Sequence, residues 1–133
     1  MGGRENKLIT AMKKNESFSL RARGKSFKYA IDGTARFLRS EHNALLHLTG
    51  TLFVIVMAVL THVSKSEIIY LTLASGFVWA AELFNTAIEK IMDFISVQQH
   101  PEIKFIKDIS AAAVLVAAIV AFITGCIVFI PKL

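Results

Sequence analysis

The sequence predicts an all-α integral membrane protein with an N-terminal amphipathic helix and three membrane-spanning helices. Three observations lead to this fold class. The 133-residue chain is 54% hydrophobic and only 19% charged, and its mean hydropathy is +0.55, which argues against disorder and against an ordinary soluble domain. Three apolar stretches approach the length needed to cross a bilayer. Ten of the 15 Lys and Arg residues lie within residues 1–42.

The N-terminal third combines a polar arm with an amphipathic helix. Residues 1–17 are polar and lack the apolar segment of a secretory signal peptide, so we expect a flexible arm there. Further on, Phe27, Ile31 and Leu38 recur at helical spacing, with basic residues on the opposite side. A helix with one apolar and one basic face is typical of the membrane interface. The alternative, a helix packed on a soluble core, is less favoured because strongly apolar segments follow.

Three apolar segments are the predicted membrane spans. Residues 43–63 carry no formal charge, and residues 68–81 are apolar with a helical pattern that continues into Glu82. Residues 109–130 contain no charged residue. About 20 apolar residues in a helix cross a hydrocarbon core of about 30 Å. The third span meets this length outright, the first tolerates a few polar residues, and the second requires its polar end to lie in the headgroup layer.

The connections between the spans set the topology. Residues 61–67 are short enough to join the first two spans as a helical hairpin, and we expect Ser66 to be the N-cap of the second span. The N-terminal region and the 90–108 connection hold 13 of the 15 basic residues. The positive-inside rule therefore places both in the cytoplasm. We predict a multi-pass protein of the cytoplasmic (inner) membrane with one membrane-embedded domain over residues 18–133.

Two other classes of function are disfavoured by the sequence. The single cysteine, Cys126, excludes a disulfide framework within the chain, and we expect Cys126 and Trp79 to be packing residues. A basic arm can bind nucleic acid, but the chain lacks a nucleic-acid reading module. Attraction to anionic lipid is the simpler explanation of the positive charge, so we expect no nucleic-acid partner.

Four polar residues form a stripe at the inner end of the second span. At about 100° per residue they fall on one face of a helix. They are Glu82, Asn85, Glu89 and Asp93. Like charges one turn apart repel, and carboxylates near hydrocarbon are costly, so this stripe opposes stability. It suits a divalent cation with oxygen ligands or a carboxylate kept as a base; the alternative is a solvated face of a helix that leaves the membrane.

Polar residues occur at the same depth in the other two spans. Glu41 precedes the first span and is followed by Asn43 and His47, while Lys107 and Asp108 precede the third. Magnesium is usually held by one or two carboxylates plus phosphate oxygens, and basic residues nearby suit a nucleoside triphosphate. Anchoring at the membrane interface explains each residue alone equally well. His47 is explained as well by a hydrogen bond inside the helix bundle.

These residues resemble the signature of the small prokaryotic diacylglycerol kinase family, which includes undecaprenol kinases. The signature E-x-x-N-(S/T)-A-I-E-x-x-x-D is matched at every fixed position from Glu82 to Asp93. Glu41 and the Lys107-Asp108 pair match by order and spacing. The resemblance covers about residues 18–130. One departure is Ala111, which stands where a serine is common after the Lys-Asp pair.

The resemblance implies a role for each matched residue. It implies that Glu82 is the general base that takes the proton from the lipid hydroxyl, and that Asn85 orients nearby groups. It implies that Glu41 and Glu89 hold the Mg²⁺ that bridges the phosphates of ATP. The implied nucleotide-binding residues, besides a basic residue of the N-terminal helix, are Tyr29, Glu41, Glu89, Lys107 and Asp108. The implied lipid-binding residues are Asn43, His47 and Glu82.

The resemblance therefore implies an ATP-dependent lipid kinase that works as a homotrimer with shared active sites. Sharing would help to shield charges that three thin helices expose. We expect diacylglycerol, converted to phosphatidic acid, as the substrate. Undecaprenol is the alternative, because Glu41 and Asn43 followed by His47 are similar to the undecaprenol kinase branch. The alternative of another class is a non-catalytic small membrane oligomer whose acidic stripe binds or passes cations.

Overall fold

The structure is a computed structural model that describes residues 20–96, 98 and 100–133. These residues form four α-helices and a short C-terminal 3-10 helix, η1 (Ile130–Lys132), as the all-α prediction requires. The chain divides into two units, residues 1–39 and residues 40–133. The predicted polar arm, residues 1–17, lies outside the described residues.

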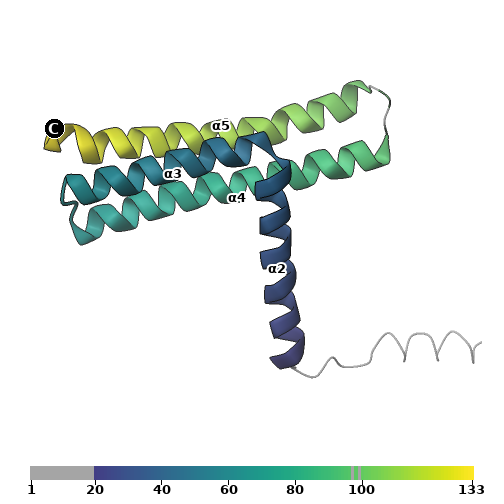
Figure 1. Ribbon diagram of the computed structural model, residues 1–133. Coiled ribbons are helices and arrows are strands. Elements are labelled where there is room, and N and C mark those ends of the chain that lie inside the picture. Colours follow the sequence, from purple (N-terminus) through teal and green to yellow (C-terminus); the bar gives the residue numbers. More distant parts are fainter. Residues whose placement is uncertain (1–19, 97, 99) are drawn as a thin grey trace, which may run out of the picture. The chain divides into compact units, whose positions relative to one another are not determined.

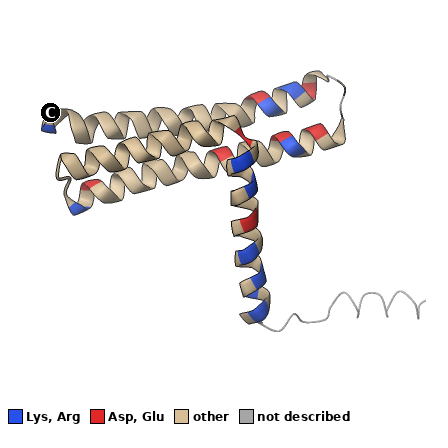
Figure 2. Ribbon diagram, in the orientation of Figure 1, with Lys and Arg blue, Asp and Glu red and all other residues tan. Residues whose placement is uncertain are grey.

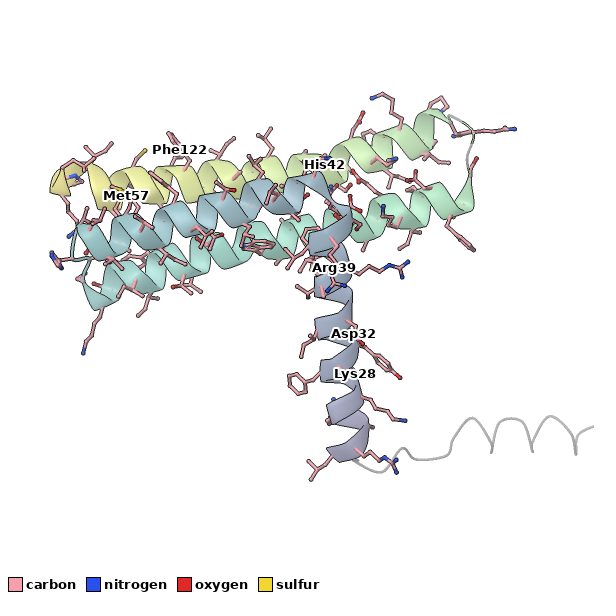
Figure 3. All side chains as sticks on the ribbon, in the orientation of Figure 1. Lys28, Asp32, Arg39, His42, Met57 and Phe122 are labelled. Atoms are coloured by element: carbon pink, nitrogen blue, oxygen red, sulfur yellow. The ribbon has the colours of Figure 1, made fainter. Side chains whose placement is uncertain are left out.

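Helix α2 (Leu20–Ser40) is the amphipathic helix that the sequence predicts. Figure 2 shows Lys and Arg residues along its whole length, and Figure 3 shows the side chains of Lys28 and Asp32 one turn apart on it. Apolar side chains of the same helix are exposed as well, with Phe27 at 73% and Ile31 at 67%. Such a helix is stabilised where its apolar face meets lipid; its position at the membrane surface stays a prediction.

Helices α3 (His42–Leu60), α4 (Lys65–Ile95) and α5 (Pro101–Phe129) lie side by side (Figure 1). Each is long and apolar enough to cross a membrane, so the structure has a candidate membrane-spanning helix at each of the three predicted spans. At 1.5 Å per residue α4 is about 46 Å long, well beyond a hydrocarbon core of about 30 Å. Most charged residues of α4 and α5 lie toward the ends joined by the connection between them, whereas Lys65 and Glu67 lie at the opposite end of α4 (Figure 2).

The inner half of α4 shows how a span can carry a polar stripe. Glu82 is 2% and Asn85 5% exposed, whereas Leu83 and Phe84 are 37% and 71% exposed. The helix is therefore amphipathic here, with its polar face turned inward and its apolar face outward. Since α4 is one unbroken helix to Ile95, the stripe continues on the same helix as the apolar segment before it.

An apolar cluster holds the opposite end of the three helices together. Leu71, Val128 and Phe129 are buried there, and further apolar residues pack against them. These are Val54, Met57, Ala58 and Val63. Most large apolar side chains of the spans are exposed instead, such as Phe122 at 73% (Figure 3). An apolar surface of this extent calls for a cover of lipid or of neighbouring chains.

The turn between α3 and α4 is tight because α3 ends in a Schellman motif. The His62 N–H bonds to the Val59 carbonyl (3.4 Å), and the Val63 N–H bonds to the Ala58 carbonyl (3.3 Å), which is the pattern of this C-terminal cap. His62 adopts the left-handed conformation that the motif needs, with φ 50°. Histidine tolerates this conformation better than most residues other than glycine.

Ser64, not Ser66, is the N-cap of α4, so the predicted cap was wrong. The Ser64 Oγ accepts a hydrogen bond from the Glu67 N–H (3.4 Å), and the Glu67 carboxylate accepts one from the Ser64 N–H (2.6 Å). This reciprocal pair is a capping box, in which the acidic residue lies three positions after the cap rather than directly after it. Lys132 Nζ, 3.2 Å from Glu67 Oε2, links the same turn to the C-terminal end.

We expect Ser64→Ala to lower the free energy of unfolding by about 1 kcal/mol, because the Glu67 N–H loses its acceptor at the start of α4. Ser66→Ala is the matched control, since the Ser66 hydroxyl contacts the Ser64 hydroxyl (3.2 Å) but takes no part in the two backbone bonds of the capping box. It should change stability by less than about 0.5 kcal/mol. Denaturant titration in detergent micelles measures both, and equal losses would contradict this assignment of the cap.

Candidate active site

Glu82 of α4 is a buried carboxylate, 2% exposed, in the membrane-spanning part of the chain. Its Oε2 lies 3.4 Å from Nε2 of His47 on α3, and the His47 side chain is itself only 14% exposed. A carboxylate removed from water is costly unless a hydrogen-bonding partner compensates it. The His47 contact provides that compensation and ties α3 to α4 at this depth.

Trp79 packs against the His47 ring and is anchored to α3 through Thr51. The Trp79 Nε1–H donates to the Thr51 hydroxyl (2.9 Å), which donates in turn to the His47 carbonyl (2.8 Å). The rings of Trp79 and His47 meet edge-on, with centroids 6.2 Å apart and planes at 61°. From the sequence, Trp79 is predicted to be a packing residue only. Its spacing from Glu82, one helical turn, is the sequence feature that could have placed it beside the polar residues.

Asn85 is the second buried polar residue of the stripe, at 5% exposed, and it joins α4 to α5. Its Oδ1 accepts a hydrogen bond from the Ser110 hydroxyl (2.7 Å), and its Nδ2 donates to Glu89 Oε1 (3.3 Å). Ser110 therefore orients the amide so that its NH₂ group faces Glu89. Sequence reasoning missed Ser110 and noted only Ala111, where a serine is common. The structure supplies a hydroxyl one position earlier.

The polar stripe passes from buried to exposed along α4. Glu82 is buried, Glu89 is half-buried, and the Asp93 side chain is 60% exposed. Lys107 of α5 donates to Asp93 Oδ1 at 2.9 Å, and the two inner carboxylates have His47 and Asn85 as partners. Each carboxylate of the stripe thus has a polar side chain within contact distance. These contacts offset the repulsion between carboxylates spaced about one turn apart.

Glu41, the residue before α3, pairs with Lys90 of α4. The Lys90 Nζ lies 2.9 Å from Glu41 Oε1, and the Ser40 hydroxyl donates to the same oxygen at 3.2 Å. The Lys90 ammonium holds the pKa of Glu41 below its usual value, with the Ser40 hydrogen bond assisting. Because Lys90 is next in sequence to Glu89, this ion pair joins the start of α3 to the part of α4 that carries Glu89.

Glu41 and Glu89 are the predicted Mg²⁺ ligands. Within residues 20–96, 98 and 100–133, no group of three or more His, Cys, Asp or Glu side chains comes together to form a metal site. Magnesium needs only one or two protein carboxylates when phosphate oxygens and water supply its other ligands. Glu41 and Glu89 fit such a partial set, since the contacts described above engage only the Oε1 atom of each.

A cavity of about 720 Å³ lies where α4 and α5 converge on their connection. This volume is within the usual range for small-molecule sites. Its lining residues are Asp93, Ser96, Gln98, His100, Pro101, Ile103, Lys104, Lys107 and Asp108. Lys107 pairs with Asp93, and Asp108 accepts a hydrogen bond from Lys104. The cavity thus offers ammonium groups for anionic oxygens beside carboxylates that accept from hydroxyl or amino groups.

The structure brings together some of the predicted site residues and leaves others apart. His47 meets Glu82, Asn85 meets Glu89, and the Lys107-Asp108 pair lines one cavity. Asn43 is exposed on the first turn of α3, and its contact with lipid stays a prediction. Tyr29 is 68% exposed on α2, in the other unit of the chain, and its contact with the nucleotide also stays a prediction.

Residues 28–129 match the family described as prokaryotic diacylglycerol kinase. The chain belongs to this family. An undecaprenol kinase from Bacillus subtilis (strain 168) is 37% identical over 109 residues, which cover 82% of this chain and 89% of that relative. A diacylglycerol kinase from Synechocystis sp. is also 37% identical over 109 residues, which cover 81% of this chain and 62% of that relative.

Membership of the prokaryotic diacylglycerol kinase family confirms the resemblance predicted from the sequence from Glu82 to Asp93. The chain is a lipid kinase of this family, which disfavours the alternative of a non-catalytic membrane oligomer. Kinase activity implies ATP as the phosphate donor. Identity does not separate the two lipid substrates that the relatives are named for.

We expect Ser110→Ala to lower kcat about tenfold, because the buried Asn85 carbonyl loses its donor and the amide is free to turn away from Glu89. Ser110→Thr keeps the hydroxyl and should retain most of the activity. Thr124→Ala is the control, since the Thr124 hydroxyl bonds to the Val120 carbonyl of its own helix. Transfer of labelled phosphate from ATP to lipid measures all three. Equal losses in the two alanine variants would contradict the proposed orientation of Asn85.

We expect Lys90→Gln to raise the pKa of Glu41 toward its ordinary value, because the ammonium group that stabilises the carboxylate is removed. In the wild type the lowered pKa adds stability that is complete above the ordinary pKa and disappears as the pH falls through the lowered one. The carboxyl carbon shift of Glu41 across a pH titration measures the change. Lys104→Gln, whose partner is Asp108, should leave Glu41 unchanged, and an unchanged Glu41 in Lys90→Gln would refute the pairing.

Proposed function

We propose that this chain transfers the γ-phosphate of ATP to the hydroxyl group of a membrane lipid alcohol, with Glu82 as the general base. The observation that carries the proposal is a carboxylate, 2% exposed, on a membrane-spanning helix of a lipid kinase family member. A lipid hydroxyl cannot leave the membrane to meet a base in water. A carboxylate within the spans can accept the proton at the depth in the membrane where the lipid hydroxyl lies.

The proposed reaction needs little covalent work from the protein, since phosphoryl transfer depends mainly on alignment and on neutralising charge. The lipid oxygen attacks the γ-phosphorus, its proton passes to Glu82, and the bond to ADP breaks. Asn85 contributes by position. Its amide, oriented by Ser110, holds Glu89 through Oε1 and so keeps a second carboxylate close to the base.

We assign Mg²⁺ to Glu41 and Glu89, as the family resemblance implies. When bound, the ion neutralises charge on the ATP phosphates. The donor set supports this assignment, because two carboxylates from α4 and from the start of α3 suffice for a metal that also binds phosphate and water. Lys90 binds Glu41 Oε1, so the metal would be held through Oε2, and the Lys90 ammonium would add positive charge near the phosphates.

The cavity at the α4–α5 connection is the proposed nucleotide site. Lys107 offers a cation for the phosphates and Asp108 an acceptor for the nucleotide's hydroxyl or amino groups, and both line the cavity. Its volume of about 720 Å³ suits a nucleotide. We also assign Tyr29 and a basic residue of α2 to nucleotide binding, and this assignment is based only on the family resemblance.

Two lipid alcohols are candidate acceptors. The sequence analysis favoured diacylglycerol, and the family description and the Synechocystis relative support it. Undecaprenol is supported by the larger share of the relative that the match covers. The match covers 89% of the Bacillus subtilis undecaprenol kinase but 62% of the Synechocystis diacylglycerol kinase, and the identity is 37% in both. We propose undecaprenol as the first acceptor to test and diacylglycerol as the second.

The proposal includes orientation and assembly. We place the N-terminus and the α4–α5 connection in the cytoplasm, which the gathering of 13 of the 15 basic residues on that side supports. We also propose a homotrimer with shared active sites. The exposed apolar surface of α3, α4 and α5 supports this assembly, because it is available to neighbouring chains as well as to lipid.

The test of the proposed function is phosphate transfer from labelled ATP in mixed micelles that contain undecaprenol or diacylglycerol, with Mg²⁺ or with a chelator. Labelling of one lipid that requires Mg²⁺ would support the proposal and identify the acceptor. Labelling that persists in the chelator would overturn the Mg²⁺ assignment. Failure to label either lipid, from folded protein, would overturn both candidate acceptors.

We expect Glu82→Gln to lower turnover by about 10² to 10⁴-fold, because the amide has nearly the shape of the carboxylate but cannot accept the hydroxyl proton. Size-exclusion elution of the purified protein should stay the same. Glu67→Gln, at the opposite end of α4, is the matched control and should retain wild-type turnover. Wild-type turnover in Glu82→Gln would show that the base has been assigned wrongly.

A further inference from the structure

We propose that His47 is a positioning residue that acts through Glu82, rather than a contact for the lipid substrate. Its Nε2–H holds one oxygen of the Glu82 carboxylate so that the other oxygen faces the lipid hydroxyl. This inference rests on the proposed function of Glu82 as the general base. It replaces the lipid-binding role that the sequence resemblance implies for His47.

The proposed role of Glu82 specifies which atom donates. A general base is a carboxylate that only accepts hydrogen bonds, so in the proposed function the hydrogen lies on His47 Nε2, 3.4 Å from Glu82 Oε2. The separation of 3.4 Å is long for an N–H···O bond. Hydrogen bonds of catalytic groups are often long in the absence of substrate and shorten when it binds.

The His47 ring makes its contacts with Glu82 and Trp79. The side chains of His47 and Glu82 are 14% and 2% exposed, so the two groups face each other within the protein. Asn43, one turn earlier on α3, is exposed and is therefore the better candidate for a lipid contact. The chemistry available to the His47 ring is thus directed at Glu82.

Trp79 restricts the His47 ring by packing. The two rings meet edge-on with centroids 6.2 Å apart, and the Trp79 Nε1–H bonds to the Thr51 hydroxyl on α3, which bonds to the backbone carbonyl of His47. Trp79 and Glu82 lie one turn apart on α4. The same helix therefore carries the carboxylate and the group that braces its partner, and this arrangement limits the orientations that Glu82 can take.

Steady-state kinetics in mixed micelles test the proposal with four proteins: the wild type, His47→Phe, His47→Gln and His62→Asn. Phenylalanine keeps a planar ring without a donor, whereas the glutamine Nε2 donates from a similar distance along the side chain. His62 lies in the turn between α3 and α4 and has a left-handed conformation that asparagine tolerates, so His62→Asn is the control for losing a histidine.

We expect His47→Phe to lower kcat by about 10- to 100-fold, with the KM for lipid and for ATP within about twofold of wild type. His47→Gln should recover most of the loss, and His62→Asn should match the wild type. A higher lipid KM with unchanged kcat in His47→Phe would overturn the proposal in favour of a lipid contact. Equal losses in His47→Phe and His47→Gln would also overturn it, because packing rather than a donor would then be responsible.

A second measurement does not depend on turnover or on the folding of a His47 variant. The ¹⁵N shift of His47 Nε2 is recorded in the wild type and in Glu82→Gln. A changed shift in Glu82→Gln supports the contact, and an unchanged shift overturns it. The two failures are distinguishable: an inactive wild type overturns the proposed function, whereas an active wild type with an unaffected His47→Phe overturns this inference alone.

Discussion

The burial of the Glu82 carboxylate among three apolar helices is the constraint on which the rest of the structure depends. A carboxylate in that environment needs polar partners, and a single helix cannot supply them. His47 of α3 meets this need directly, and Trp79 packs against the His47 ring and bonds to Thr51 of α3. The polar layer between α3 and α4 therefore follows from the burial of one carboxylate.

The same constraint orders the polar groups along α4. In the buried part of the stripe the partners are uncharged side chains, as with Asn85 and Ser110. Where the helix emerges, full ion pairs such as Lys107 with Asp93 take over. Exposed ion pairs contribute little stability, so the packing of the three helices depends on other contacts. The apolar cluster around Leu71 and the capped turn between α3 and α4 provide these contacts at the opposite end of the helices.

Local sequence patterns predicted the elements well and their junctions less well. Apolar length identified three spans because a bilayer sets the length of any helix that crosses it. The predicted N-cap of α4 was wrong. Ser64 and Ser66 both lie shortly before Glu67, and only the backbone geometry shows that Ser64 forms the capping box. Ser110 was missed because a serine within an apolar span has no periodic signal.

The sequence alone determined the spans, the amphipathic N-terminal helix and the polar stripe from Glu82 to Asp93, since these depend on helical period and hydropathy along one segment. Only the tertiary structure decided the partners of that stripe. The contacts of Glu82 with His47, of Asn85 with Ser110 and of Asp93 with Lys107 join residues of different helices. Which faces of two helices meet depends on their packing and rotation, and this information is not contained in the pattern of either helix.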